Sequence, residues 1–175
     1  MKVERYWIQA IAKDYNNTQI GEIYGNVDEI KDRRIIVYSS EIGYKNKNYK
    51  IYFKSKEIND KEAMFEIDKI ELSRDYISRI IKKGTTKRDV VKKIKIDGKD
   101  YYVKVLVLLQ KTRRKIGSEA KRKTEEFVEN FFKDKNMKQI ADEVIEGKAK
   151  EELTKIIKKI YPLKAVEIRY IMPAQ

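Results

Sequence analysis

The segment "DVVKKIKIDGKDYYVKVLVLL", residues 89–109, gives the strongest indication of the fold. Two runs rich in β-branched and aromatic residues flank the dipeptide Asp97-Gly98. Such a dipeptide between two strand-like runs is typical of a tight β-hairpin turn, because both residues tolerate positive φ. Val105–Leu109 is apolar without interruption, which predicts a strand buried on both faces. We therefore expect a sheet in which the strand that contains Val105–Leu109 is central.

The residues before the hairpin predict further strands and one short helix. Three runs combine β-branched and aromatic residues with partial alternation: "RRIIVYSSEI" (33–42), "KNYKIYFKSKEI" (47–58) and "EAMFEIDKIEL" (62–72). In "LSRDYISRIIKKG" (72–84) the spacing of apolar residues becomes helical. Ser73 is a candidate N-cap of this helix and Gly84 a candidate stop.

The last third of the chain predicts helices followed by a strand. A helix is expected to begin at Ser118, and its apolar face is formed by Ala120, Phe127, Val128, Phe131 and Phe132. Two more helices are expected at about 138–146 and about 153–160. The run "KAVEIRYI" (164–171) alternates as a closing strand.

These elements predict an α+β fold. Its core is expected to be an antiparallel or mixed, β-barrel-like sheet with flanking helices, C-terminal helices and a returning C-terminal strand. We expect a single domain over residues 1–175. Within it, the β-rich body covers about 1–110, the helical layer about 117–161 and the closing strand about 164–171.

The composition excludes several classes of site. The chain contains no Cys and no His, so a disulfide framework, a Cys-based metal site and the usual general base are unavailable. No glycine-rich nucleotide-binding motif occurs, and no cofactor or metal is predicted. The longest apolar run, Val105–Leu109, is far shorter than the roughly 20 residues of a membrane span. The start has no signal-peptide pattern. We expect a soluble cytoplasmic protein.

The positive charge is confined to the middle of the chain. The formal net charge is +13, and Ser73–Lys123 holds 18 basic and 5 acidic residues. The flanking regions are balanced, with 13 of each sign before this block and 10 of each after it. A block of a single sign predicts a surface that binds a polyanion, since an ordinary solvated surface mixes the signs.

The sharpest part of the block is "QKTRRKIGSEAKRKT", residues 110–124. Its cations form two groups around Ile116-Gly117. If a helix begins at Ser118, the second group lies in its first two turns and opposes the helix dipole. A bound phosphate would reverse that cost, and Gly117 would let the anion approach the backbone closely. The alternative is a solvated charge run.

A second group of cations surrounds Gly84, Thr85 and Thr86, whose backbone and hydroxyl groups suit phosphate oxygens. The alternative is a helix C-terminus stabilised by Lys in its last turn. The predicted RNA-binding residues are Lys82, Lys83, Lys87, Arg88, Lys111, Arg113, Arg114, Lys115, Lys121, Arg122 and Lys123. We interpret the strand lysines Lys92, Lys93, Lys95 and Lys104 as a solvated sheet face. Tyr101 and Tyr102 are weaker candidates for base stacking.

Two other functional classes stay open. The same basic block could dock an acidic partner protein or an anionic membrane surface. A carboxylate-dependent nuclease would need acids such as Glu125, Glu126 and Glu129, or Asp142, Glu143 and Glu146. These six residues fall on amphipathic polar faces, which favours a solvated helix surface over a two-metal site.

Several motifs resemble one family in order and approximate spacing. They are "YWIQAIA" followed by "IGE", "ELSRDYISRIIKKG", "DGKDYYVKV", "TRRKIGSEAKR" and "KIYPLKAVEIR". The family is the small-subunit ribosomal protein of archaea and eukaryotes that is named S-one in the eukaryotic-type nomenclature and S-three-A in the older one. It is distinct from the bacterial ribosomal protein S-one.

The resemblance implies a structural constituent of the small ribosomal subunit and not an enzyme. The family lies on the platform, near the 3′ end of the small-subunit rRNA and the mRNA exit. The implied partners are small-subunit rRNA, neighbouring ribosomal proteins and, as a further candidate, mRNA near the exit. Matching motifs imply rRNA contacts for Lys82–Arg88, Lys111, Arg113, Arg114, Lys121 and Arg122. Glu119 stands where the family commonly has Gln, and we expect it to cap locally or to pair with Arg122.

Overall fold

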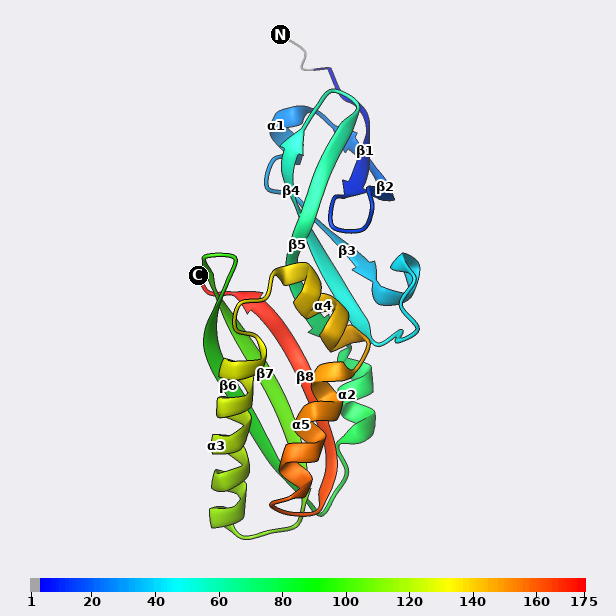
Figure 1. Ribbon diagram of the computed structural model, residues 1–175. Helices are drawn as coiled ribbons and strands as arrows, with labels where there is room; N and C mark the ends of the chain where they lie inside the picture. Colours follow the sequence, from blue (N-terminus) through cyan, green and yellow to red (C-terminus); the bar gives the residue numbers. More distant parts are fainter. Residues whose placement is uncertain (1–3) are drawn as a thin grey trace. The chain divides into compact units, whose positions relative to one another are not determined.

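The computed structural model describes residues 4–175, and Figure 1 gives the order of the elements along the chain. The chain divides into two compact units, Met1–Lys69 and Ile70–Gln175. The long strand β5 (Glu62–Leu72) passes through the boundary between them. The prediction of a single domain stays a prediction, and each unit is described by itself.

The first unit is a five-stranded mixed sheet in the order β2-β1-β5-β4-β3. Its other strands are β1 (Tyr6–Ala12), β2 (Thr18–Gly25), β3 (Arg34–Tyr38) and β4 (Tyr49–Ile58). β1 is antiparallel to β2 and parallel to β5. A short helix α1 (Val27–Ile30) follows β2. Alternating residues of these strands, including Ile8, Ile51, Phe53 and Phe65, are fully buried and form the core of this unit.

One predicted strand of the first unit is shorter than expected. The strand expected over 33–42 ends at Tyr38, because Ser39–Ile42 turns into a short 3-10 helix, η1. The Ser39 hydroxyl donates a hydrogen bond to the carbonyl of Asn46 and is fully buried. This bond ties the turn to the chain that leads into β4.

The second unit is built on the predicted hairpin. β6 (Thr85–Ile96) and β7 (Lys99–Gln110) pair antiparallel along their whole length. Asp97 and Gly98 at the turn have φ of 50° and 75°, as the dipeptide predicts. β8 (Leu163–Pro173) pairs with the other side of β7, and the end of β5 pairs with β8. Val105–Leu109 is at most 1% exposed, so the prediction of a central strand buried on both faces is confirmed.

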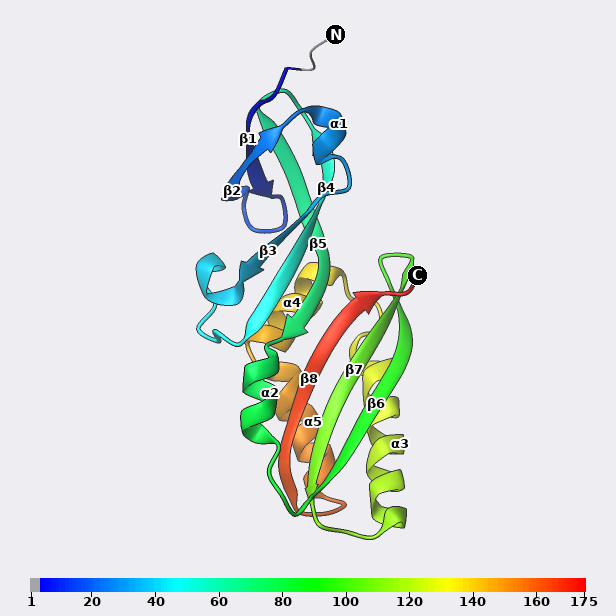
Figure 2. The ribbon, with the colours of Figure 1, turned by 180° about the vertical axis from the view of Figure 1, so that it is seen from behind.

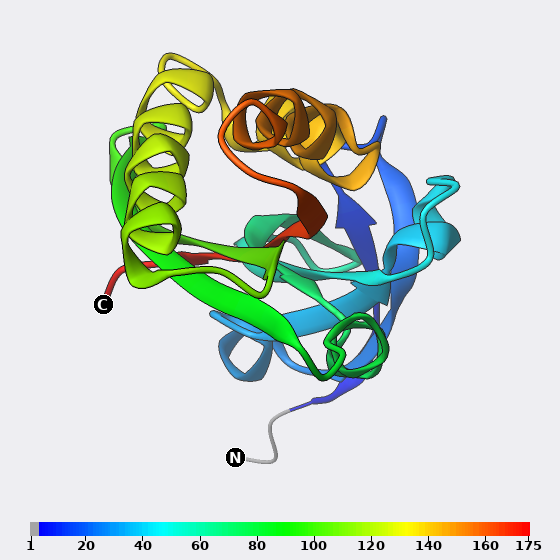
Figure 3. The ribbon, with the colours of Figure 1, turned by 90° about the horizontal axis from the view of Figure 1, so that it is seen from below.

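Four helices belong to the second unit: α2 (Arg74–Ile80), α3 (Arg114–Phe131), α4 (Met137–Ile145) and α5 (Lys148–Lys158). α3 and α5 lie in front of the strands in Figure 1, and the strands lie in front of them in Figure 2. Seen from below, both helices stand on the same side of the sheet (Figure 3). The predicted α+β class, with a mixed sheet, flanking helices and a returning C-terminal strand, is confirmed.

The start of α3 differs from the prediction. The helix begins at Arg114 with Arg113 at the N-cap position, and Ser118 lies inside it, donating its hydroxyl proton to the carbonyl of Arg114. A tertiary bond explains the early start, because the Thr112 N–H donates to the Thr86 hydroxyl at 3.0 Å and fixes the chain just before the helix. No helix within residues 4–175 combines the length and the apolarity that a membrane span requires.

Candidate nucleic-acid interface

The hairpin register brings the two predicted groups of cations together. Thr85 pairs with Gln110, so the start of β6 lies beside the end of β7, at the end of the sheet opposite the Asp97-Gly98 turn. The bond between Thr112 and Thr86 closes this end. Residues 82–88 and 111–115, which are separated by more than twenty residues in the sequence, therefore form one surface.

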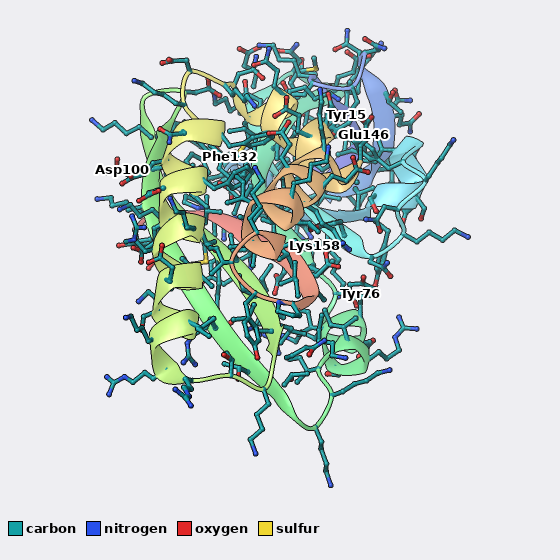
Figure 4. The ribbon with its side chains drawn as sticks, turned by 60° about the horizontal axis from the view of Figure 1, so that its bottom comes forward. Tyr15, Tyr76, Asp100, Phe132, Glu146 and Lys158 are labelled. Atoms are coloured by element: carbon teal, nitrogen blue, oxygen red, sulfur yellow. The ribbon has the colours of Figure 1, made fainter. Side chains whose placement is uncertain are left out.

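A third basic segment lies at the same end and was missed by the sequence reasoning. Leu163, at the start of β8, pairs with Leu109 at the end of β7. The Gln110 N–H donates to the Pro162 carbonyl at 3.2 Å, and the Tyr161 hydroxyl donates to the Lys111 carbonyl at 3.4 Å. These contacts bring the exposed side chains of Lys158, Lys159 and Lys164 to this end. Figure 4 labels Lys158 on α5 and shows nitrogen-tipped side chains extending from the lower end of the unit.

We call this surface the basic end and define it as residues 79–88, 110–118 and 158–164. These segments contain 12 Lys and Arg residues and no Asp or Glu. Within residues 4–175, eleven of the 12 have no carboxylate within ion-pair distance; they are Arg79, Lys82, Lys83, Arg88, Lys111, Arg113, Arg114, Lys115, Lys158, Lys159 and Lys164. The twelfth, Lys87, lies 3.2 Å from Asp89. So many unpaired cations at one end attract anions strongly and repel one another.

The first hollow lies at the border of the basic end, between the start of β6 and the first turns of α3. It is open, has a volume of about 810 Å³ and is lined by Thr85, Thr86, Lys87, Arg88, Asp89, Thr112, Arg114, Ser118 and Lys121. Its one carboxylate, Asp89, faces Lys87 and lies 4.0 Å from a guanidinium nitrogen of Arg169. The hollow therefore keeps a net positive charge. The Thr86 hydroxyl accepts a backbone N–H, so its own proton remains available to an anion.

Arg88, which lines this hollow, lies against Gly117 of α3. A Cβ atom at position 117 would lie 2.6 Å from two nitrogens of the Arg88 guanidinium, Nε and Nη2, far inside van der Waals contact. Arg88 also donates from Nη1 to the carbonyl of Lys87 at 3.1 Å. The expectation that Gly117 leaves room for a ligand is thus corrected, because the guanidinium of Arg88 occupies that space. The glycine positions an arginine that a ligand can reach.

A second hollow, of about 500 Å³, adjoins the first, and Thr85 lines both of them. The second hollow is lined by Arg79, Ile80, Lys82, Lys83, Gly84, Thr85, Lys164 and Ala165. Four of these residues are cationic and none is acidic, and they come from the end of α2, the loop after it and the start of β8. Gly84 has a φ of 77°, a left-handed conformation that lets the loop turn tightly here. Both hollows suit the oxygens of a phosphate backbone.

Lys121, Arg122 and Lys123 differ from the other predicted residues because α3 already neutralises them. Arg122 pairs with Glu119 at 2.6 Å and with Glu126, and Lys123 and Lys121 lie 3.4 and 3.9 Å from Glu126 and Glu125. The hydrogen bond from Arg122 holds the pKa of Glu119 below its usual value, although slight desolvation acts the other way. The predicted pairing of Glu119 with Arg122 is confirmed. The prediction that this group lies in the first two turns is wrong, since the helix starts four residues earlier.

The remaining charged candidates are mostly paired. Lys93 pairs with Asp100 at 2.9 Å, as expected for a solvated sheet face. Lys92 lies on the opposite face, which α3 covers, and pairs with Glu129 of that helix at 2.6 Å, so the expectation is wrong for Lys92. The helix acids Asp142 and Glu143 likewise pair with Lys138 and Lys135. Over the described residues, no group of three or more carboxylates is arranged to hold a metal ion. Tyr101 is only 6% exposed, so its ring is part of the core and is not available for base stacking.

Comparison with known proteins agrees with the motifs. A family model described as the Ribosomal S3Ae family matches residues 4–173. The chain belongs to this family. The resemblance drawn from the five motifs is therefore confirmed. The match covers both units and all three segments of the basic end.

Archaeal members of the family are similar to this chain. The small ribosomal subunit protein eS1 of Haloarcula marismortui is 29% identical over 125 residues, which are 70% of this chain and 58% of that protein. The eS1 protein of Natronomonas pharaonis is 26% identical over 96% of this chain and 84% of its own length. The eS1 protein of Archaeoglobus fulgidus is 28% identical, with coverage of 94% and 82%. The alignment thus spans a little over half of the first relative and more than four fifths of the other two.

Proposed function

We propose that this S3Ae-family chain is a structural, non-enzymatic constituent of the small ribosomal subunit in the cytoplasm and that it binds small-subunit rRNA through the basic end. The observation that carries the proposal is the meeting of three segments with 12 cations and no acid at one end of the sheet. The printed names of the archaeal relatives support the ribosomal role. Its partners are rRNA and neighbouring small-subunit proteins.

We also propose a position for the chain within the small subunit. The resemblance of the motifs implies the platform, near the 3′ end of the rRNA and the mRNA exit. mRNA near the exit is a further candidate partner on the same basis.

The proposal explains why the fold accepts this charge. Like charges at one end of the free protein repel, and Arg113 and Arg114 at the start of α3 also oppose the helix dipole. Phosphates placed against the two hollows remove both costs, because each guanidinium can bind two oxygens and the first turn of the helix offers free N–H groups. Contacts of this kind position the protein on the RNA backbone and carry little sequence information.

The structure changes the set of proposed contact residues. The unpaired cations Lys82, Lys83, Arg88, Lys111, Arg113, Arg114 and Lys115 stay in it, and Arg79, Lys158, Lys159 and Lys164 join them. Lys87 lines the first hollow but shares its charge with Asp89. Lys121, Arg122 and Lys123 become secondary candidates, because an approaching phosphate has to compete with their carboxylate partners.

Filter binding of the purified chain to small-subunit rRNA tests the proposal. If six or more phosphates are neutralised, the logarithm of the association constant should fall against the logarithm of the salt concentration with a slope of about −5 or steeper. A flat salt dependence would contradict the proposal. Displacement of the rRNA by vesicles of phosphatidylglycerol at equal total charge would instead favour the alternative, a basic protein that docks an acidic partner or an anionic surface.

A further inference from the structure

An exposed aromatic pair stands on the first unit. Trp7 of β1 and Tyr24 of β2 lie directly opposite each other in the strand register, and their ring centroids are 5.4 Å apart. Trp7 is 65% exposed and Tyr24 is 54% exposed. Trp7 is also the one tryptophan of the chain. Large aromatic side chains that face solvent together are typical of surfaces that bind another molecule.

The free charges beside this pair are negative on balance. Gln9, two residues along β1 from Trp7, pairs with Glu22 of β2 on one side and with Glu62 of β5 on the other. Both glutamates are exposed, and neither has a cation within ion-pair distance in residues 4–175. Arg5, which directly precedes β1, is held by Glu29 at 2.6 Å. Lys61, which directly precedes Glu62, is exposed and offsets one of the two glutamates. The patch therefore carries a small net negative charge in a chain whose net charge is +13.

This charge distribution decides which partner fits. Bases can stack on exposed tryptophan and tyrosine rings, but such platforms in RNA-binding proteins lie in positively charged grooves that follow the phosphates. Glu22 and Glu62 would repel phosphates. They would attract ammonium and guanidinium groups, which also bind favourably over the face of a tryptophan ring.

The strand beside the pair has a free edge. β2 pairs with β1 on one side, and no described strand pairs with its other side. Such an edge presents unpaired N–H and C=O groups to an extended peptide. Main-chain bonds to β2 would supply affinity, and alternate side chains of the peptide would reach Tyr24 and Glu22.

We propose that the patch of Trp7, Tyr24, Glu22 and Glu62 binds an extended, Lys- and Arg-rich peptide segment of a neighbouring protein. The segment adds to the edge of β2, places one cation over the aromatic pair and sets another against Glu22. Glu62, on β5 two strands further in, adds to the negative potential of the patch. This site is separate in sequence from the basic end and does not depend on RNA binding there.

Trp7 fluorescence tests the proposal without a label, because no other tryptophan contributes to the signal. The probe is a blocked nonapeptide of alternating Arg and Val, titrated into the intact chain. A matched Glu–Val nonapeptide and a nine-residue oligouridylate serve as comparison ligands. The expected result is a saturable change of emission with the Arg–Val peptide alone. An equal change with oligouridylate would overturn the proposal in favour of RNA, and no change with the Arg–Val peptide would also overturn it.

Two charge-reversal variants separate the patch from a general charge effect. Glu22→Lys with Glu62→Lys should weaken the Arg–Val peptide about tenfold or more, because two attractions become repulsions. Glu151→Lys with Glu152→Lys makes the same change in net charge on exposed residues of α5 and should leave the affinity within about twofold. Equal weakening by both pairs would contradict the proposal. The variant with Glu22→Lys and Glu62→Lys should keep its rRNA affinity. Failure of the peptide-binding proposal and failure of the rRNA-binding proposal therefore give different results.

Discussion

Replacing Arg113 and Arg114 by Ala should raise stability while it weakens rRNA binding. Arg113 is the N-cap residue of α3 and Arg114 its first helical residue, and the first turn contains no acid to offset them. A cation at a helix N-terminus costs about 0.3–1 kcal/mol at low ionic strength. Removing both should therefore increase the free energy of unfolding by about 1 kcal/mol, which corresponds to a rise in Tm of about 3 °C for a chain of this size.

The same double substitution should remove two phosphate contacts. A charge-assisted hydrogen bond contributes about 1.5 kcal/mol, so losing two should weaken rRNA binding on the order of 100-fold at low salt. The salt slope should become shallower by about 2. Thermal melting of the free protein and filter binding at several salt concentrations measure the two effects on one preparation.

A matched control exists on the same helix. Arg122→Ala with Lys123→Ala makes the same change in net charge, but these cations are already paired with Glu119 and Glu126. Binding should weaken only a few-fold, and the free energy of unfolding should stay level or fall by about 0.5 kcal/mol. If both double variants lose affinity equally, the effect comes from net charge and the reasoning about the basic end is refuted. A loss of stability in the Arg113 and Arg114 variant would refute the helix-dipole argument.

Three further outcomes follow from close contacts in the second unit. Gly117→Ala should change the melting temperature little, because a helix-propensity gain of about 1 kcal/mol is offset by the displacement of Arg88. The rRNA affinity of this variant, measured by filter binding, should fall. Glu167→Ala should lower the free energy of unfolding by about 2 kcal/mol in urea titrations, because the buried carboxylate pairs with Lys150 of α5 and accepts the hydroxyl of Tyr76 at 2.9 Å. The free energy of unfolding of the unmodified chain should fall above about pH 10.

The sign of the pH effect follows from two raised pKa values. Burial and the hydrogen bond to Glu167 raise the pKa of Tyr76. Partial burial is the largest single effect on the pKa of Lys150 and acts to lower it. The hydrogen bond to Glu167 and the attraction of its charge, with a smaller contribution from Tyr76, together outweigh burial, so the pKa is raised. Both groups hold their protons more tightly in the folded state, so their contribution is complete below the unfolded pKa values and is lost as pH rises through the folded ones.

Each of these outcomes can fail separately. Unchanged rRNA affinity in Gly117→Ala would show that the position of Arg88 does not matter for binding. A Glu167→Ala variant as stable as the parent would show that the buried pair contributes nothing. The urea midpoint of the parent should drop between pH 9 and pH 11 by more than that of Glu167→Ala, and equal drops would contradict the pKa argument.

Local chemistry explains which parts of the fold were predictable. The hairpin around Asp97-Gly98 follows from turn conformation and from two neighbouring runs, so it needs no distant contact. The start of α3 could not be predicted in this way. Ser118 is a plausible N-cap in the sequence, but the bond between Thr112 and Thr86 joins residues 26 apart and fixes the chain before Arg114.

The candidate site shows the same limit. Counting charge in sequence windows found residues 82–88 and 111–115 but hid Lys158, Lys159 and Lys164, because the last third is neutral as a whole. A local count over "KIIKKIYPLK" (155–164) would have shown lysines without any acid. The block boundary at Lys123 also separated the cations of α3 from Glu125 and Glu126, which neutralise them one turn later.

Lysine reactivity in the assembled subunit shows whether rRNA covers the basic end. Purified small subunits that contain the chain are treated with an amine-modifying reagent, before and after digestion of the rRNA, and modification is measured at Lys82, Lys111, Lys158 and Lys164. We expect all four to be protected in intact subunits and to become reactive once the rRNA is removed. Equal reactivity of these lysines in intact and digested subunits would contradict this expectation.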